Sequence, residues 1–286
     1  MSEELLKINN LSFAYDDTPV LKDISVSISR GEKIAVMGSN GAGKSTFFLN
    51  LNGVLKPDQG EIILEGQKVD KKSYVRLHQK VGFVFQDADS QIIASTVKAE
   101  ISFGPMNLEL DKEEVKKRVE NAIDYMALED LKDRPPHYLS GGEKKRVSIA
   151  DILAMEPEVL IFDEPMAALD PVNAMNVEEI LGRLHEDGKT LLIATHDVDF
   201  AFRFADRILV FSDGNLIADG SPLEIFHRRE VMEKAHLRMP AMMTVWEALL
   251  KERIVTESEA YPLTPEQLVQ KIYAASGRQM VGRMED

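Results

Sequence analysis

Apolar and polar residues alternate in LLKINNLSFAY at 5–15 and again in ISVSISRGEKIAVMG at 24–38. A period of two places alternate side chains on one face, so residues 5–35 are predicted to form short strands. Strands are also expected in EIILEG at 61–66 and RILVFSDG at 207–214. Three more apolar runs predict buried strands that end in polar residues: VGFVFQ at 81–86, VLIFDE at 159–164 and TLLIATH at 190–196.

Helical patterns separate these strands. One helix is expected from Lys44 to about Asn52 and another near 172–186. An amphipathic pattern covers 111–131, with Asp111 as its N-cap and a proline pair following at 135–136. Apolar strands that alternate with helices predict an α/β fold whose mainly parallel sheet is covered on both faces. Residues 87–138 interrupt this alternation and are predicted to be a helical insertion.

From about Ser221 the patterns are helical only. TPEQLVQKIYA at 264–274 carries Thr264 as a cap, a proline at the first helical position and Gln267 completing a capping box. An earlier helix is expected to have one apolar face, formed by Met242, Trp246, Leu249 and Leu250. We therefore expect a main domain at 1–225 and a helical C-terminal extension at 226–286.

Composition narrows the class of protein. The 286 residues are 44% hydrophobic, enough for a sizeable core, and include no cysteine, which excludes disulfides and thiolate metal sites. A net charge of −14 disfavours binding to nucleic acid. The N-terminus MSEELLKINN lacks the basic start of a signal peptide, and apolar runs such as VLIF are too short to cross a bilayer. Any contact with a membrane is therefore expected to come through partners.

A phosphate-binding loop is predicted at 38–46, where GSNGAGKST matches G-x-x-x-x-G-K-[ST] between a strand and a helix. Its glycines let backbone N–H groups surround the β- and γ-phosphates at the start of the helix. Lys44 would bridge oxygens of those phosphates and Ser45 would bind Mg²⁺. The predicted site comprises Gly38, Ser39, Asn40, Gly41, Ala42, Gly43, Lys44, Ser45 and Thr46.

Polar residues at the strand ends extend this site, because strand C-termini line one crevice in open α/β sheets. Successive strand side chains point to opposite faces, so Asp163 and Glu164 should have different roles. Asp163 would reach Mg²⁺, directly or through water, and Glu164 would orient or deprotonate the attacking water. Gln86 would bind Mg²⁺ or water and His196 would contact the γ-phosphate. Each stretch taken alone also fits a structural role, as a solvated acidic turn or a hydrogen-bonded strand end.

A second candidate anion site is LSGGEKKR at 139–146. Ser140 followed three residues later by Glu143 is a capping box, which a helix start alone would explain. A helix start does not explain Gly141 and Gly142, because glycine in a helix costs about 1 kcal/mol relative to alanine. Glycines here are useful if another group must approach the backbone closely.

The motifs together resemble those of ATP-binding cassette (ABC) ATPases, in the family's order and spacing over roughly residues 4–225: GSNGAGKST, Gln86, LSGGE followed by KKR, VLIFDEP, AALD at 167–170 and His196. The resemblance implies a P-loop NTPase cassette with an antiparallel N-terminal β subdomain, a mainly parallel core sheet and a helical insertion. It also implies ATP hydrolysis with Glu164, His196 and Lys44 as catalytic residues. Mg²⁺ would be held by Ser45, Gln86 and Asp163.

In that family the LSGG-type signature binds the γ-phosphate held by the opposing subunit, so two cassettes enclose two ATP molecules head to tail. The resemblance therefore implies a dimer, in which Ser140, Gly141, Gly142 and Glu143 serve the neighbour's nucleotide. It also gives Asp170 a contact with the other subunit's site. Tyr15 would stack on adenine, although an aromatic residue on the surface of an edge strand is the alternative.

Two positions depart from the family pattern, since Met166 stands where Thr is usual and Ala168 where Gly is usual. Neither change removes a ligand, so ATP hydrolysis should survive.

Within the family, the stretches at 86–110 and 139–165 resemble the ATPase subunits of energy-coupling-factor (ECF) importers, nearest the cobalt and nickel branch. That resemblance implies a peripheral protein on the cytoplasmic face of the cell membrane. A membrane coupling protein would dock on the 87–138 insertion, and a separate membrane subunit would capture the substrate. The extension at 226–286 could help to hold the dimer together.

Several alternatives stay open at this point. The cargo could be cobalt, nickel or a vitamin, and a heterodimer with a paralogue could replace the expected homodimer. A cassette of another transporter type is a further alternative. A nucleic-acid- or ribosome-associated cassette is disfavoured by the negative charge and the single set of motifs.

Overall fold

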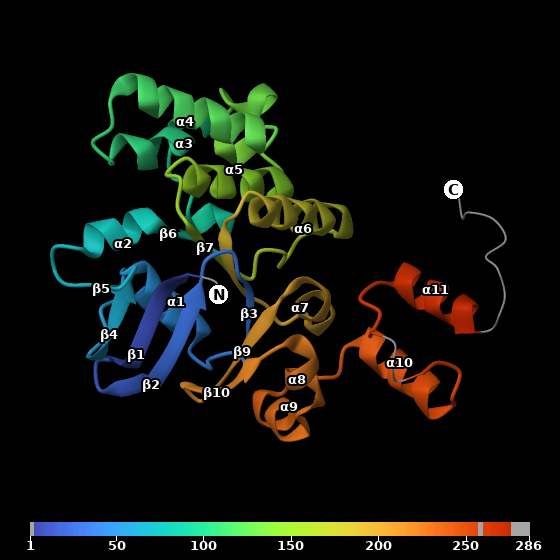
Figure 1. Ribbon diagram of the computed structural model, residues 1–286. Coiled ribbons are helices and arrows are strands. Elements are labelled where there is room, and N and C mark those ends of the chain that lie inside the picture. Colours follow the sequence, from blue (N-terminus) through green and yellow to red (C-terminus); the bar gives the residue numbers. More distant parts are fainter. Residues whose placement is uncertain (1–2, 257–259, 276–286) are drawn as a thin grey trace.

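The computed structural model describes residues 3–256 and 260–275. Figure 1 shows two sheets side by side, a group of helices at one end of the larger sheet, and two C-terminal helices to the side of the main body. Within the described residues, no helix is both long enough and apolar enough to cross a membrane.

The N-terminal sheet is antiparallel, in the order β2-β1-β4-β5. The larger sheet has the order β10-β9-β3-β8-β7-β6, and every neighbouring pair in it is parallel except β9 with β10. The predicted combination of an antiparallel N-terminal part and a mainly parallel core sheet is confirmed. The strands are β1 Glu4–Tyr15, β2 Thr18–Ser29, β3 Lys33–Met37, β4 Gln59–Leu64, β5 Gln67–Lys68, β6 Val81–Val84, β7 Val159–Asp163, β8 Thr190–Ala194, β9 Arg207–Ser212 and β10 Asn215–Gly220.

Helices pack on both faces of the larger sheet (Figure 1). Three short 3₁₀ helices, at Ala88–Ser90, Glu129–Leu131 and Pro136–Tyr138, lie within the predicted insertion. The α-helices are α1 Lys44–Asn52, α2 Tyr74–Lys80, α3 Val97–Met106, α4 Lys112–Tyr125, α5 Gly141–Leu153, α6 Pro171–Glu186, α7 Val198–Phe204, α8 Pro222–His227, α9 Arg229–Ala235, α10 Ala241–Lys251 and α11 Pro265–Ala275.

Strand β7 shows why the core strands are apolar throughout. Its residues Val159 and Ile161 belong to a core shared with α1 and the antiparallel sheet, whereas Leu160 and Phe162 belong to a core shared with α3–α6. Both faces of the strand are therefore buried, so a run of apolar residues replaces the alternating pattern. The polar ends of these strands are left at one edge of the sheet, where a ligand can reach them.

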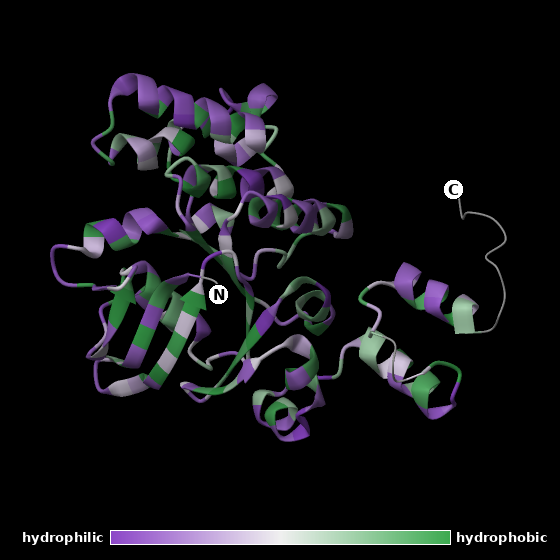
Figure 2. Ribbon diagram, viewed as in Figure 1, coloured by the Kyte–Doolittle hydropathy of each residue, from purple (hydrophilic) through white to green (hydrophobic). Residues whose placement is uncertain are grey.

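The predicted insertion at 87–138 contains the helices α3 and α4. Helix α5 packs against α3 and α4, so the helical group continues beyond residue 138. Helix α4 ends at Tyr125 rather than near residue 131, because Met126 caps it and Ala127 has a positive φ of 50°. Figure 2 shows α4 as mostly hydrophilic with apolar bands, as expected for a helix that covers a core with one face.

The sequence pattern predicts two strands at 190–196 and 207–214 with no helix between them, but the structure has a helix between β8 and β9. Helix α7 occupies 198–204, capped by the Asp197 side chain, which accepts hydrogen bonds from the N–H groups of Asp199 and Phe200. The physical reason is topological: β8 and β9 run parallel on either side of β3, and parallel strands need a crossover connection. Helix α2 and strand β10 are likewise absent from the prediction.

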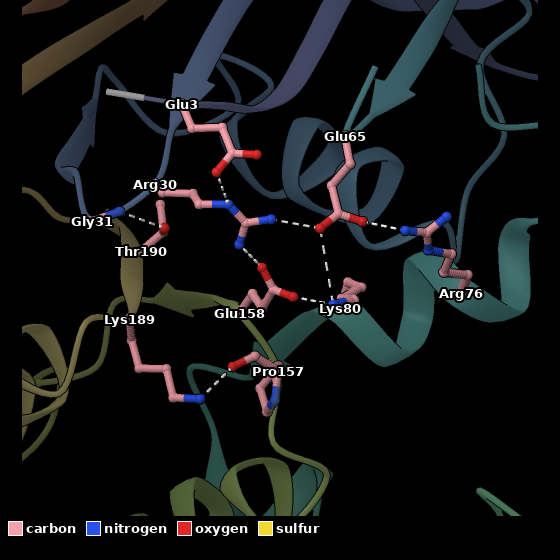
Figure 3. Close-up of polar contacts among 10 residues, drawn as sticks. All are labelled: Glu3, Arg30, Gly31, Glu65, Arg76, Lys80, Pro157, Glu158, Lys189 and Thr190. Carbon is pink, nitrogen blue, oxygen red and sulfur yellow. Dashed lines mark hydrogen bonds and ion pairs between the residues drawn. The ribbon is translucent and has the colours of Figure 1, made fainter. Parts of the chain in front are cut away.

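An ion-pair network joins the antiparallel sheet to the core sheet (Figure 3). Arg30, which follows β2, contacts Glu3, Glu65 and Glu158. Lys80, the last residue of α2, contacts Glu158 as well. The network fixes the end of β2, the end of α2 and the start of β7 relative to one another, near the N-terminal end of β7.

The C-terminal helices α10 and α11 pair with each other and lie beside the main body (Figure 1). Trp246 and Met243 of α10 are fully buried, whereas the predicted face residues Met242, Leu249 and Leu250 are half-buried. Helix α11 begins at Pro265 as predicted, and Thr264 Oγ1 accepts from the N–H of Gln267 at 3.3 Å. The Gln267 side chain accepts from the N–H of Leu263 rather than of Thr264. Residues 257–259 and 276–286 of the predicted extension lie outside the described residues.

Candidate nucleotide-binding site

A pocket of about 340 Å³ lies at the carboxyl ends of the core strands. It brings together residues from the β3–α1 loop, from the ends of β7 and β8, and from the segment after β6. The predicted polar strand ends therefore do converge. The lining residues are Val20, Asn40, Gly41, Gly43, Lys44, Ser45, Thr46, Gln86, Asp163, Glu164 and His196.

Two glycines of the loop are required by its backbone path. Gly38 has a φ of 141°, and a Cβ atom there would lie 2.2 Å from the backbone oxygen of Phe211. Gly43, with a φ of 102°, is the N-cap residue of α1. Only glycine adopts such conformations without strain, so the loop can curl and direct the first N–H groups of α1 toward an anion.

Lys44 is the first residue of α1 and is 7% exposed. Its Nζ donates to the carbonyl oxygens of Gly38 at 2.8 Å and of Ser39 at 3.1 Å, which holds the ammonium inside the loop. Burial lowers the pKa of Lys44, while the nearby carboxylates of Glu164 and Asp163 oppose that shift. An anion that enters the pocket would relieve this burial penalty, because it would supply the missing negative charge.

Ser45 and Asp163 come from different elements and meet in the pocket. Ser45 Oγ donates to Asp163 Oδ2 at 2.6 Å, although 118 residues separate them in sequence. A hydroxyl and a carboxylate side by side are the oxygen ligands that Mg²⁺ prefers beside phosphate groups. Gln86 lines the same pocket and adds a third oxygen donor. The three residues predicted to hold Mg²⁺ fit that ion.

Glu164 follows directly after β7 with a φ of 46°. Strand alternation predicts opposite faces for Asp163 and Glu164, but both line the pocket, because the chain leaves the extended conformation at Glu164. Burial raises the pKa of Glu164 to about 7, against the lowering effects of Lys44 and of the backbone N–H of His196. Its Oε1 atom is buried and has no hydrogen-bond partner among the described residues, so it is free to accept from a bound molecule.

Gln86 and His196 lie two residues beyond β6 and β8, not at the strand ends as predicted. Both nevertheless line the pocket. Burial, followed by the positive charge of Lys44, lowers the pKa of His196, and Asp163 opposes this shift. A neutral imidazole can both donate and accept a hydrogen bond, which suits a contact to phosphate or water.

The predicted capping box at the start of α5 is confirmed. The N–H of Glu143 donates to Ser140 Oγ at 3.3 Å, and the N–H of Ser140 donates to Glu143 Oε2 at 2.7 Å. Among the residues that the structure describes, those at 140–143 do not line the pocket of their own chain. Ser140 and Gly141 are exposed, whereas Gly142 is buried. Within one chain, the second candidate anion site is thus separate from the pocket that holds the first.

Tyr15 and Asp170 also lie outside the pocket lining. Tyr15 ends β1 and is 46% exposed. Its ring makes an edge-to-face contact with the ring of Phe13, with 4.9 Å between the ring centroids. Asp170 is exposed and caps α6, accepting from the N–H groups of Val172 and Asn173. The chain alone brings neither residue to the phosphate loop.

Lys145 is a site neighbour that sequence reasoning missed. This residue of α5 is 2% exposed, and its Nζ donates to the carbonyl oxygens of Phe85 at 3.0 Å and Gln86 at 2.7 Å. Burial lowers its pKa to about 8. Lysine in a basic run normally suggests a solvated helix face, and only the fold reveals that this one ties α5 to the segment carrying Gln86.

A site built wholly from metal-ligating side chains is not indicated. In 3–256 and 260–275, no group of three or more His, Asp or Glu side chains is placed to hold a metal ion.

Comparison with known proteins agrees with this geometry. The family described as "ABC transporter" matches residues 21–167. The chain is 47% identical over 250 residues to the energy-coupling factor transporter ATP-binding protein EcfA2 of Methanospirillum hungatei, a match that covers 86% of this chain and 63% of that protein. It is also 47% identical over 251 residues to EcfA of Methanocaldococcus jannaschii, covering 87% of this chain and 90% of that protein.

Two solved structures resemble the fold. One is CbiO1 from Clostridium perfringens, described as part of the ABC transporter complex cbiONQ, with a TM-score of 0.73 and 42% identity over 86% of this chain and 99% of that one. The other is a dimeric ATP-binding cassette in a post-hydrolysis state bound to ADP and Pi, with a TM-score of 0.67 and 30% identity. That match covers 76% of this chain and 99% of the other.

Proposed function

The chain belongs to the ABC transporter family and is a Mg²⁺-dependent ATPase of that family, and on this premise we propose that it energises import as the ATPase subunit of an ECF-type transporter. The observation that carries the proposal is the convergence of Lys44, the Ser45–Asp163 pair and Glu164 in one pocket. Phosphate binding, metal binding and a basic group are thereby available within one reaction site.

Each residue of the pocket has a distinct task in this proposal. The loop at 38–46 and the N-terminus of α1 bind the phosphates, and Lys44 supplies positive charge to them. Ser45, Asp163 and Gln86 hold Mg²⁺, which when bound neutralises charge on the phosphates. Glu164 accepts a hydrogen bond from the attacking water through its unpartnered Oε1 atom. His196 orients that water or contacts the γ-phosphate.

We propose that two copies close around two ATP molecules. The support is the position of the signature residues 140–143, which do not line their own pocket although Ser140 and Gly141 are exposed. A similar cassette forms a dimer in its post-hydrolysis state. In such a dimer the signature and Asp170 would meet the partner's nucleotide, and Tyr15 would stack on adenine. A homodimer is proposed because one chain carries every motif, and a paralogue is the alternative partner.

The domain organisation is proposed to follow from this assembly. Residues 1–225 form the ATPase domain, with its helical part at about 87–138, and residues 226–286 form an extension that helps to hold the dimer together. Exposed apolar residues on the described helices of the extension support this role, among them Val245 at 41% and Val269 at 43%. They would be buried in an assembly.

A membrane coupling protein is proposed to dock on the helical insertion. Several large apolar side chains are exposed there, including Ile93 at 74%, Phe103 at 57% and Met106 at 69%. Glu100 fixes the loop that carries Ile93, because its carboxylate accepts from the N–H groups of Ile93 and Ala94 at 2.9 and 2.6 Å. A rigid, exposed apolar surface suits a partner protein and would place this chain on the cytoplasmic face of the membrane.

Cobalt or nickel ions are the proposed cargo. The support is the likeness to CbiO1, since that protein is described as part of the cbiONQ complex. Relatives named only as energy-coupling factor ATP-binding proteins leave a vitamin transporter as the alternative. Uptake of labelled cobalt and nickel by cells that depend on this chain, with labelled vitamins tested in parallel, would decide between them.

The variant Glu164→Gln tests the catalytic proposal. It should bind ATP, form a stable dimer and hydrolyse ATP at least a hundredfold more slowly, because Gln cannot accept the proton. Unchanged turnover would reject the role of Glu164.

Ser140→Arg should abolish hydrolysis while ATP binding to the monomer is retained, and full activity of that variant would reject the head-to-tail dimer.

The variant Ile93→Asp tests the docking surface. It should leave ATP binding intact and abolish co-purification with membrane proteins in detergent, because a charge would be buried against the partner. Leu223→Asp on α8, where the side chain is 38% exposed, is the matched control and should still co-purify. Equal recovery of membrane partners with both variants would remove the proposed surface.

A further inference from the structure

The two signature glycines differ in what surrounds them. A Cβ atom on Gly141 would meet nothing closer among the described residues than Leu169 Cδ2, at 3.9 Å. A Cβ atom on Gly142 would lie 2.0 Å from Oδ1 and 2.4 Å from Cγ of Asn173. Gly141 therefore has room for a side chain within its own subunit, whereas Gly142 does not. The requirement for glycine at 142 originates inside the chain.

Asn173 belongs to the first turn of α6, and the orientation of its amide is set by Asp170. The Asp170 carboxylate accepts from the backbone N–H groups of Val172 at 3.0 Å and Asn173 at 3.1 Å, and from Asn173 Nδ2. These hydrogen bonds, the side-chain one foremost, lower the pKa of Asp170. An ionised carboxylate can only accept, so Nδ2 must face Asp170 and Oδ1 must face Gly142.

We propose that Asn173 is a positioning residue that fixes the signature segment at Gly142 to the loop at Asp170, so that both approach the opposing nucleotide as one rigid unit. The inference rests on the head-to-tail dimer proposed above and assigns a residue that governs its closure. Gly142 lies in α5 of the helical group, whereas Asp170 follows β7 of the core sheet. The Asn173 amide packs against Gly142 and donates to Asp170, so its loss would weaken the connection between the two parts beside the signature.

Two substitutions separate the hydrogen bond from mere space filling. Asn173→Asp has nearly the same shape as the wild type but places a carboxylate against Asp170, which repels it. Asn173→Ala removes both the bond and the contact. If Asn173 only filled space, Asn173→Asp would behave as the wild type, whereas a positioning role predicts that it is at least as damaging as Asn173→Ala.

The test uses the full-length chain with Glu164→Gln, which is expected to dimerise with ATP. Adding Asn173→Asp should raise the ATP concentration for half-maximal dimerisation at least tenfold, measured by analytical ultracentrifugation. Binding of a fluorescent ATP analogue to the monomer should change less than twofold, because Asn173 does not line the phosphate pocket among the described residues. Dimerisation within twofold of the Glu164→Gln protein would overturn the proposal.

A double substitution tests the contact itself. Gly142→Ala should lower the thermal midpoint, because its Cβ overlaps Asn173 Oδ1, and adding Asn173→Ala should restore part of that loss. A further fall in the double variant would overturn the contact. If the Glu164→Gln protein remained monomeric with ATP, the dimer proposal would fail and this inference with it. That result is distinct from the one in which Glu164→Gln dimerises and Asn173→Asp has no effect.

Discussion

Nε2 of His196 lies 3.2 Å from Oε1 of Glu164, without the alignment that a hydrogen bond needs. Burial raises the pKa of Glu164 to about 7, and burial together with Lys44 lowers the pKa of His196. Near neutral pH the pair is therefore a partly ionised carboxyl group beside a neutral imidazole. A base with a pKa close to the working pH is well matched to proton transfer from water.

The raised pKa of Glu164 should make the stability of the folded state depend on pH. A carboxyl whose pKa rises on folding, here from 4.5 to about 7, destabilises the folded state progressively as pH increases through that window, because only the unfolded chain ionises freely. Glu164→Gln removes the cost. We expect equal stability of the two proteins below about pH 4.5, and a gain of about 1–2 kcal/mol for the variant above about pH 7, discounted for solvent screening.

Thermal unfolding without nucleotide, repeated across that pH range, measures the effect. Glu120→Gln, an exposed position on α4, corrects for the loss of one negative charge. A stability difference between Glu164→Gln and the wild type that does not vary with pH would contradict the raised pKa.

Although Lys145 lies in a basic run of the sequence, its substitution should lower the stability of the fold more than that of its neighbour Lys144. Lys145→Met removes the charged donor to the carbonyl oxygens of Phe85 and Gln86, and the loss of these part-buried hydrogen bonds should cost about 1–3 kcal/mol. Hydrolysis should slow as well, because the segment carrying Gln86 loses its attachment to α5. Lys144→Met is the matched control, since Lys144 pairs with the exposed Asp89, and should cost less than about 1 kcal/mol. Urea unfolding of both variants gives the comparison.

Ala168 occupies a left-handed conformation with a φ of 61°. A non-glycine residue there carries a strain of about 1–2 kcal/mol, which equals or exceeds the conformational entropy of about 0.5–1 kcal/mol that glycine would lose on folding. Ala168→Gly should therefore be neutral or stabilising by about 0.5 kcal/mol, measured as a thermal midpoint. Ala167→Gly, at a neighbouring position without a positive φ, should instead be destabilising by about 0.5–1 kcal/mol. Equal losses at both positions would contradict the strain at Ala168.

Substitution of Glu158 should reveal how much the ion-pair network in Figure 3 contributes to the stability of the fold. Its carboxylate is shared by Arg30 and Lys80, and its side chain is 26% exposed. Glu158→Gln keeps the shape but removes the charge, which should cost about 1–2 kcal/mol at low salt and less at high salt. Glu3→Gln removes a partner of Arg30 that is 74% exposed, and should cost less than about 0.5 kcal/mol. Urea midpoints at two salt concentrations would reveal whether the two positions differ.

Much of the fold was predictable because it depends on local patterns. Apolar runs such as 159–162 identify strands that are buried on both faces, and the glycine-rich loop at 38–46 identifies itself by its spacing. The errors occur where the decisive interaction is not local. Helix α7 is short, and its presence follows from β8 and β9 being parallel strands on either side of β3. The convergence of Asp163 and Glu164 follows from one positive φ that strand periodicity cannot foresee.

The sequence by itself determined which chemical groups are present and where the chain turns, because glycine, proline and capping residues act on their immediate neighbours. Only the tertiary structure decided which distant groups meet, such as Ser45 with Asp163, Lys145 with Gln86 and Asn173 with Gly142. The physical reason is that burial, unlike local conformation, is a property of the assembled core. It alone turns a lysine of a basic run into a buried donor and gives a carboxyl group a pKa near neutrality.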